Sequence, residues 1–167
     1  MSENVIVETS LGSFHIALDH ARAPRSVENF LRYVDAGHYS ETVFHRVIAS
    51  FMVQGGGYDT AYNKKPTQRP VESEADNGLE NRRGTVAMAR TSDPHSATAQ
   101  FFVNVVDNGF LNHQDKSERG WGYTVFGQVA EGMDVVDAIR KQPTGSAGPF
   151  AKDAPLQPVL IHAIRRA

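Results

Sequence analysis

Residues 43–57 read VFHRVIASFMVQGGG, two apolar segments followed by three consecutive glycines. The β-branched and aromatic residues of Val43–Ile48 and Phe51–Gln54 predict two short strands, because such side chains pack well on a pleated surface. In the second strand, alternation places Met52 and Gln54 on one face. The glycines then allow the backbone to bend sharply or another group to approach it closely.

Arg46 interrupts the first of these apolar segments. A guanidinium is always charged in proteins and is costly to bury without a partner. Taken alone, the segment favours an Arg46 that lies on a solvated face and covers apolar surface with its stem. A glycine run of this kind can also cradle a phosphate, but this one lacks the P-loop lysine and opens no clear helix. A nucleotide site is therefore disfavoured.

The rest of the chain also predicts mostly short strands, since its fourteen glycines and eight prolines favour frequent turns. Phe14, Ile16 and Leu18 alternate with polar or smaller residues, which is the pattern of a half-buried strand. The other strands expected are Val5–Glu8, Thr85–Ala89, Gln100–Val105, Thr124–Val129 and Val159–Ile164.

Two helices are predicted among these strands. Pro24 suits a first helical turn and Gly37 suits a left-handed position after the last one. Between them runs one apolar stripe, Val27, Phe30, Leu31 and Val34. A shorter helix is expected at Met133–Lys141, a long polar loop at 58–81 and an irregular surface stretch at 143–158. We therefore predict a mainly β fold, a closed eight-stranded antiparallel barrel capped by two α-helices, as a single domain over residues 1–167.

The composition excludes several classes of function. The formal net charge is −2, whereas nucleic-acid and membrane-surface binders normally carry a basic excess. The chain has no cysteine, which excludes disulfides, thiolate nucleophiles and cysteine-based zinc sites. Residues 1–4 lack a leader-like basic segment, and no apolar run approaches the length of a membrane span. We expect a cytoplasmic monomer that binds neither nucleic acid nor membrane.

A second informative segment, residues 99–104, carries an amide beside large rings. Alternation puts Gln100 and Phe102 on one face, with their neighbours turned the other way. A glutamine there is usually just exposed, but a phenylalanine is not, so the pair indicates a partly apolar groove with a hydrogen-bonding rim. Phe110-Leu111 and Trp121-Gly122-Tyr123 add large side chains in expected loops, and core packing is the simpler interpretation of each.

Taken together, these segments resemble the cyclophilins. The likeness rests on Phe44–Ile48 and Phe51–Gly56, followed in the same order by Gly84–Ala89, Ala99–Phe102 and Val125–Gly127. It covers nearly the whole chain, and Ala87–Thr91 and Gly120–Tyr123 are most similar to the small bacterial single-domain members. The resemblance implies a cyclophilin-like barrel with peptidyl-prolyl cis-trans isomerase activity on unfolded or folded polypeptides, and so a role in protein folding.

The resemblance also implies roles for particular residues. Arg46 matches the catalytic arginine, and Gln54 and Gln100 match polar residues that hold the substrate backbone. The family residues that form the apolar proline pocket correspond here to Phe51, Met52, Phe102 and Leu111. Ala89 matches a position along the peptide groove. Three substrate-binding positions depart from the eukaryotic pattern: Arg90 replaces an asparagine, Phe110 a tryptophan and Tyr123 a histidine. Because a phenyl ring cannot donate the tryptophan's hydrogen bond, we expect cyclosporin to bind with reduced affinity.

This set of side chains suits the reaction. Rotation about an Xaa–Pro bond breaks amide resonance, with a barrier of roughly 18–20 kcal/mol, but changes no covalent bond. No nucleophile, metal or cofactor is therefore expected. An apolar pocket can grip the proline ring while a guanidinium donates to the prolyl nitrogen, which accepts a hydrogen bond only as the amide twists. We assign this donor to Arg46, oriented by Gln54. Because arginine does not titrate between about pH 6 and 8, the rate should be nearly independent of pH there.

Two other functions remain open at this point. A proline-segment binding module or holdase chaperone would use the same groove, although simple binding needs no donor at the amide nitrogen. A metal hydrolase is less consistent with the sequence, because the seven histidines form no close cluster of ligands. Among them, His45 is expected to be a hydrogen-bonded histidine of the core or of the barrel wall.

Overall fold

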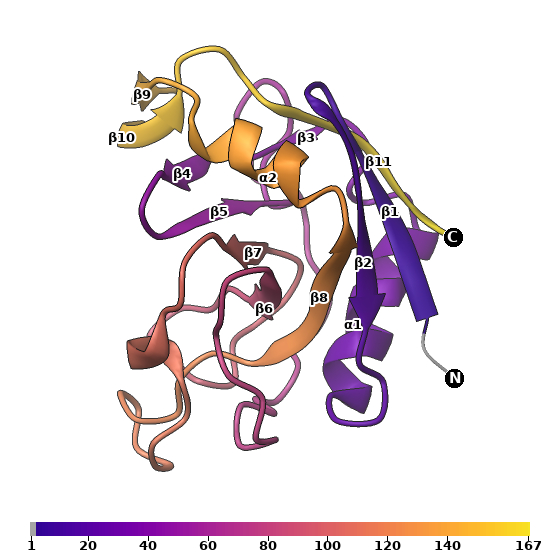
Figure 1. The fold of residues 1–167 in the computed structure, drawn as a ribbon, viewed down its shortest axis with the longest axis vertical. Helices are drawn as coiled ribbons and strands as arrows, with labels where there is room; N and C mark the ends of the chain where they lie inside the picture. Colours follow the sequence, from indigo (N-terminus) through magenta and orange to yellow (C-terminus); the bar gives the residue numbers. More distant parts are fainter. Residues whose placement is uncertain (1–2) are drawn as a thin grey trace.

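A curled antiparallel sheet dominates the computed structural model, which describes residues 3–167 (Figure 1). Within this range, nine strands follow one another across the sheet in the order β3-β11-β1-β2-β8-β6-β7-β5-β4. Their bounds are β1 Glu3–Thr9, β2 Gly12–Leu18, β3 Thr42–Val43, β4 Arg46–Ile48, β5 Met52–Gly55, β6 Thr85–Met88, β7 Phe101–Asn104, β8 Val125–Glu131 and β11 Leu160–Arg166. The start of the chain, where no leader was expected, lies partly outside the described residues.

The two edge strands of the sheet, β3 and β4, are neighbours in the chain. The sequence predicted one strand over Val43–Ile48, but Phe44 and His45 separate two short ones. The reason is that they pair with different partners: Val43 in β3 faces Leu160 in β11, and Arg46 in β4 faces Gln54 in β5. The prediction of a closed eight-stranded barrel is therefore only approximately right. Strand pairing does not join the two edge strands, which are connected only through Phe44 and His45 of the backbone.

The described part of the chain contains two α-helices, as predicted: α1 Pro24–Asp35 and α2 Met133–Arg140, together with a short 3₁₀ helix, η1, at Gly109–Leu111. Gly37 has φ +72°, the left-handed conformation expected just after α1. The N-cap residue of α1, Ala23, provides no side-chain hydrogen bond to the first turn. Instead, the Glu74 carboxylate in the long loop accepts hydrogen bonds from the backbone N–H of Ser26 (2.7 Å) and Arg25 (3.3 Å). The mainly β class with two helices is confirmed.

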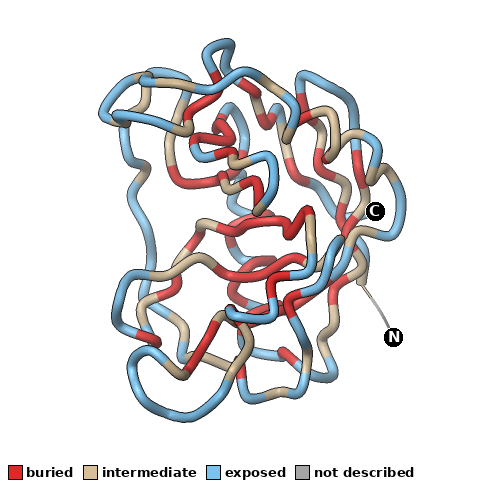
Figure 2. Tube along the Cα trace, turned by 60° about the vertical axis from the view of Figure 1, so that its left-hand side comes forward, coloured by how far each residue is buried: buried red, intermediate tan, exposed pale blue. Residues whose placement is uncertain are grey.

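The main core lies where α1 packs against the sheet. The Phe30 ring lies 5.8 Å from that of Phe101 in β7 and 5.1 Å from that of Phe126 in β8, measured between centroids. Buried residues concentrate in the strands and exposed ones in the loops (Figure 2). A second, smaller buried cluster consists of Met52, Ala87, Phe102, Leu111 and Val125. Strands β5, β6 and β7 contribute to both clusters, so they separate the main core from the smaller one.

The expectation of an irregular stretch at 143–158 is wrong. This segment contains a hairpin of β9, Thr144–Ala147, and β10, Phe150–Pro155, whose register is interrupted between Phe150 and Ala154. The segment has little hydrophobic alternation, so the sequence pattern gives no sign of strands. Tertiary contacts stabilise the hairpin instead, because the Phe150 ring packs against His45, Tyr58 and Tyr62.

His45 lies at the centre of this aromatic group. Its ring stacks on Phe150 at 5.0 Å and meets Tyr58 edge-on at 4.8 Å. The expectation of a hydrogen-bonded histidine is not met, because its Nδ1 is buried without a partner among the described residues. Burial, and to a smaller extent the positive charge of Arg46, lowers the pKa of His45 from 6.5 to about 4. The ring is therefore neutral at physiological pH.

Of the helices in residues 3–167, none is both long and apolar enough to cross a membrane.

Candidate active site

A small hollow of about 130 Å³ opens over the second cluster. Its lining consists of Arg46, Phe51, Met52, Gln54, Ala89, Arg90, Phe102, Leu111 and Tyr123. Every site residue predicted from the sequence lines this hollow except Gln100 and Phe110. Residues far apart in the chain are thus brought to one place by strands β4, β5 and β7, by η1 and by the loops around them.

Strand register places the central residues of the hollow side by side. Arg46 in β4 faces Gln54 in β5, and Gln54 faces Phe102 in β7. Directly opposed residues on neighbouring strands share a face of the sheet, so these three side chains emerge together. Met52 lies on this face as well, as the alternation predicted, whereas Phe101 belongs to the main core.

Arg46 stands exposed at the rim of the hollow. Its Cζ lies 6.0 Å from the centroid of the Phe51 ring. Within residues 3–167, its side chain makes no ion pair or hydrogen bond, so the five N–H donors of its guanidinium have no acceptor in this part of the protein. A charged donor beside a hollow with Phe102 and Met52 in its wall is suited to an acceptor supplied by a ligand.

The two glutamines form a pair at one end of the hollow. Gln54 Nε2 donates to Gln100 Oε1 at 2.9 Å, so the structure gives its hydrogen bond to Gln100 rather than to Arg46. An orienting effect of Gln54 on Arg46 stays a prediction. The Gln100 side chain lies against Gly57, where any Cβ would overlap its amide. The glycine run thus serves close approach, one of the two roles that the sequence suggested.

Phe110 borders the hollow without lining it. Its side chain is 69% exposed, although its ring stacks on that of Phe51 with centroids 5.6 Å apart. The neighbouring Leu111 points the other way in η1 and is buried in the hollow's wall. The pair of residues therefore presents one apolar wall and one exposed ring that extends the apolar surface toward solvent.

Arg90 is held firmly in the opposite wall. Its Nε donates to the Gly122 carbonyl at 2.9 Å and its Nη1 to the Thr91 carbonyl at 2.8 Å, while its Cζ lies 4.5 Å from the centroid of the Tyr123 ring. Tyr123 in turn meets Phe102 edge-on at 5.8 Å. These contacts make Arg90 a support for the Tyr123 wall, since its donors are directed at backbone carbonyls.

The sequence interpretation missed three buried asparagines beside the hollow. Asn81, Asn104 and Asn108 are at most 3% exposed and hydrogen bond to one another. Single asparagines are common in turns, so their positions in the sequence carried no signal of a shared role.

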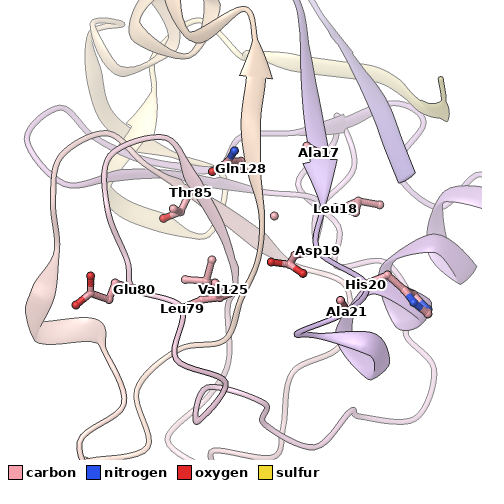
Figure 3. Close-up of a pocket in the computed structure, with 11 residues that line it drawn as sticks. Ala17, Leu18, Asp19, His20, Ala21, Leu79, Glu80, Thr85, Val125 and Gln128 are labelled. Carbon is pink, nitrogen blue, oxygen red and sulfur yellow. The ribbon is translucent and has the colours of Figure 1, made fainter. Parts of the chain in front are cut away.

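A larger hollow of about 410 Å³ lies elsewhere, between the end of β2, β8 and residues 79–80 (Figure 3). None of the predicted site residues lines it. Two of its ionisable side chains have partners: Glu80 accepts a hydrogen bond from Arg82 Nε at 2.8 Å, and His20 lies 3.4 Å from Glu28. Because no arginine, lysine or large aromatic ring lines this space, the smaller hollow is the better candidate for chemistry.

No group of three or more His, Asp or Glu side chains within residues 3–167 could hold a metal ion. The metal-hydrolase alternative thus gains no support from the described residues. That the reaction needs no metal or cofactor stays a prediction.

Comparison with known proteins bears on the family of this chain. The family model for "Cyclophilin type peptidyl-prolyl cis-trans isomerase/CLD" matches residues 4–166. The chain is 56% identical to peptidyl-prolyl cis-trans isomerase cyp18 of Streptomyces antibioticus, over 96% of each chain. It is 51% identical to peptidyl-prolyl cis-trans isomerase B of Escherichia coli, over 96% of this chain and 97% of that one.

A solved structure shares the fold. The crystal structure of a cyclophilin-type isomerase of Cryptosporidium parvum, determined in the presence of the dipeptide Ala-Pro, matches with a TM-score of 0.82 and 25% identity. The match covers 98% of both chains. The resemblance found in the sequence motifs is therefore confirmed, and this chain belongs to the cyclophilin-type peptidyl-prolyl cis-trans isomerases.

Proposed function

We propose that the chain accelerates rotation about Xaa–Pro bonds by holding the proline ring in the small hollow while Arg46 donates a hydrogen bond to the prolyl nitrogen. The observation that carries this proposal is the guanidinium of Arg46, which has no partner within residues 3–167 and stands at the rim of a hollow with the Phe102 and Met52 side chains in its wall. The Ala-Pro dipeptide named for the Cryptosporidium structure supports a proline-containing ligand for this fold.

The proposed mechanism uses binding energy rather than proton transfer. In the planar amide the nitrogen lone pair is delocalised and accepts no hydrogen bond. As the bond twists, the lone pair localises and the guanidinium can donate to it. The interaction thus exists mainly in the transition state and lowers the barrier. We assign binding of the peptide backbone to Gln54 and Gln100, and their hydrogen bond to each other at one end of the hollow supports this assignment.

The test is cis–trans exchange of a short Xaa–Pro peptide, measured by NMR with and without the protein. Acceleration that survives a chelator and stays constant between about pH 6 and 8 would support the proposal, since arginine keeps its charge there. Peptide binding without acceleration would contradict it and favour a binding module or holdase. Loss of activity in the chelator would show that a metal takes part.

Replacing Phe102 with leucine is expected to lower kcat/KM by about tenfold or more, because apolar pocket contacts of this size are worth 10-fold to 200-fold in specificity. The matched control is Phe101→Leu, a change at the adjacent, equally buried residue that faces the main core. Both variants should lose stability, but only Phe102→Leu should lose activity. Equal activities in two folded variants would place the proline elsewhere.

Phe110→Trp is expected to tighten cyclosporin binding by about tenfold, the equivalent of one added hydrogen bond. Phe110 is exposed at the rim, so the larger side chain can be accommodated. Titration calorimetry of the native protein and the variant measures the difference. An unchanged Kd would show that this position does not limit cyclosporin affinity.

We further propose that the chain works as a single-domain monomer in the cytoplasm, without nucleic-acid or membrane partners. The net charge of −2 and the lack of an obvious apolar repeat support this proposal. Light scattering of the purified protein and fractionation of its native cells test it.

A further inference from the structure

Three buried asparagine side chains form a directed chain beside the candidate site. Asn108 Nδ2 donates to Asn104 Oδ1 at 2.8 Å, and Asn104 Nδ2 donates to Asn81 Oδ1 at 3.0 Å. Asn104 Nδ2 also donates to Thr85 Oγ1 at 3.0 Å. Asn81, Asn104 and Asn108 are 1%, 0% and 3% exposed. We call these three residues the asparagine chain.

Both ends of the asparagine chain bind backbone carbonyls of residues that line the hollow. At one end, Asn108 Nδ2 donates to Phe51 O at 3.0 Å. At the other, Asn81 Nδ2 donates to Leu111 O and Tyr123 O, each at 3.3 Å. Carbonyl oxygens only accept hydrogen bonds, so each end must present its NH₂ group. This requirement fixes the orientation of all three amides.

The three residues held in this way lie outside the strands. Phe51 precedes β5, Leu111 lies in the three-residue helix η1, and Tyr123 lies in the loop before β8. Tyr123 N donates to Leu111 O at 2.9 Å, and Val105 N donates to Phe51 O at 3.2 Å, so backbone bonds join Leu111 to Tyr123 and Phe51 to the end of β7. The asparagine chain joins Phe51 to the Leu111–Tyr123 pair, through hydrogen bonds to their carbonyls that span 30 to 57 residues of sequence.

We propose that Asn81, Asn104 and Asn108 are positioning residues for isomerisation, which set the distance between the walls of the proline pocket. This inference rests on the proposed function of the hollow. Phe51 is the link to the chemistry, because its ring lies under the Arg46 guanidinium. A shift of the Phe51 backbone moves both a wall of the pocket and the surface on which the proposed donor rests.

The asparagine chain also reaches beyond the hollow. Thr85, which accepts the hydrogen bond from Asn104, lines the larger hollow shown in Figure 3. The same side chain donates to Arg82 O at 2.7 Å. The network therefore anchors the pocket walls to the start of β6, a part of the sheet that does not contact the proline.

The deciding experiment compares Asn108→Ala with Asn29→Ala. Asn29 is an equally buried asparagine on α1 whose Nδ2 donates to one carbonyl, that of Thr98 at 2.7 Å, and which does not line the hollow. Both changes remove a buried amide donor and should lower Tm. Only Asn108→Ala should lower kcat, by about 10-fold to 100-fold, the size expected when catalytic groups are misplaced. Its kcat should fall by a larger factor than its peptide affinity.

A second measurement reports on the position of the pocket wall. The ring-proton shifts of Phe51, which depend on how its ring lies against Phe110 and Arg46, should change in Asn108→Ala and remain as in the native protein in Asn29→Ala. If Asn108→Ala does not fold, Asn108→Ser takes its place under the same criteria, since serine also suits the position before a helical turn.

The outcomes separate the two proposals. If the native protein accelerates exchange but the two variants keep equal activity, the positioning role is overturned and the proposed function stands. Unchanged Phe51 ring-proton shifts in Asn108→Ala have the same consequence. If the native protein does not accelerate exchange at all, the proposed function fails and the positioning role falls with it.

Discussion

Arg46→Ala is expected to slow catalysed cis–trans exchange by about 10²–10³, the loss found when one preorganised transition-state donor is removed. The physical reason is that the alanine side chain leaves the localised lone pair of the prolyl nitrogen without a donor. Because Arg46 is exposed and makes no ion pair within residues 3–167, stability should change by less than about 0.5 kcal/mol. Exchange spectroscopy and thermal unfolding measure the two effects separately.

Arg46→Lys tests whether the reaction needs the positive charge or the directed hydrogen bond. Lysine keeps the positive charge but lacks the rigid planar fork, so it should recover only part of the rate. A rate equal to that of the native protein in Arg46→Ala would remove Arg46 from the mechanism. Full recovery with lysine would show that charge, rather than a directed hydrogen bond, is what the reaction requires.

Acidification from pH 7 to pH 4 is expected to destabilise the protein by up to about 3 kcal/mol through His45 alone. Burial lowers the pKa of this histidine from 6.5 to about 4. Between these values the unfolded chain binds a proton that the folded protein does not. Stability is therefore complete above pH 6.5 and falls as the pH drops toward 4. Urea unfolding at several pH values measures the slope.

His45→Phe provides the control for this prediction. Phenylalanine keeps an aromatic ring between Tyr58 and Phe150 but cannot take up a proton. The variant should lose much less stability over the same pH range. What remains would come from groups such as His38, whose pKa is also lowered by burial. An equal slope in both proteins would show that His45 is not the group that titrates.

The sequence predicted the parts of this structure in which side-chain periodicity and burial agree. Helix α1 and the shared face of Met52 and Gln54 are examples, because in each case one face meets a core or a pocket. The alternation in residues 99–104 also separated Phe102, at the hollow, from Phe101, in the main core.

Features that depend on tertiary partners could not be predicted in the same way. The break between β3 and β4 arises because two different strands pair with them, which no local pattern encodes. The hairpin of β9 and β10 relies on Phe150 packing against residues about a hundred positions earlier. The asparagine chain exists only once three separate segments have come together, so isolated asparagines gave no sign of it.

The position of β11 in the sheet has a consequence for biosynthesis. Strand β11 lies between β3 and β1, with Arg166 opposite Val5 (Figure 1). One side of β1 can therefore pair only after β11 has been synthesised. While residues 160–166 are still inside the ribosome, β11 cannot pair, and one side of both β1 and β3 lacks its partner strand. The barrel is thus expected to be completed only after these residues emerge, and until then it has an exposed strand edge that nearby chaperones can protect from aggregation.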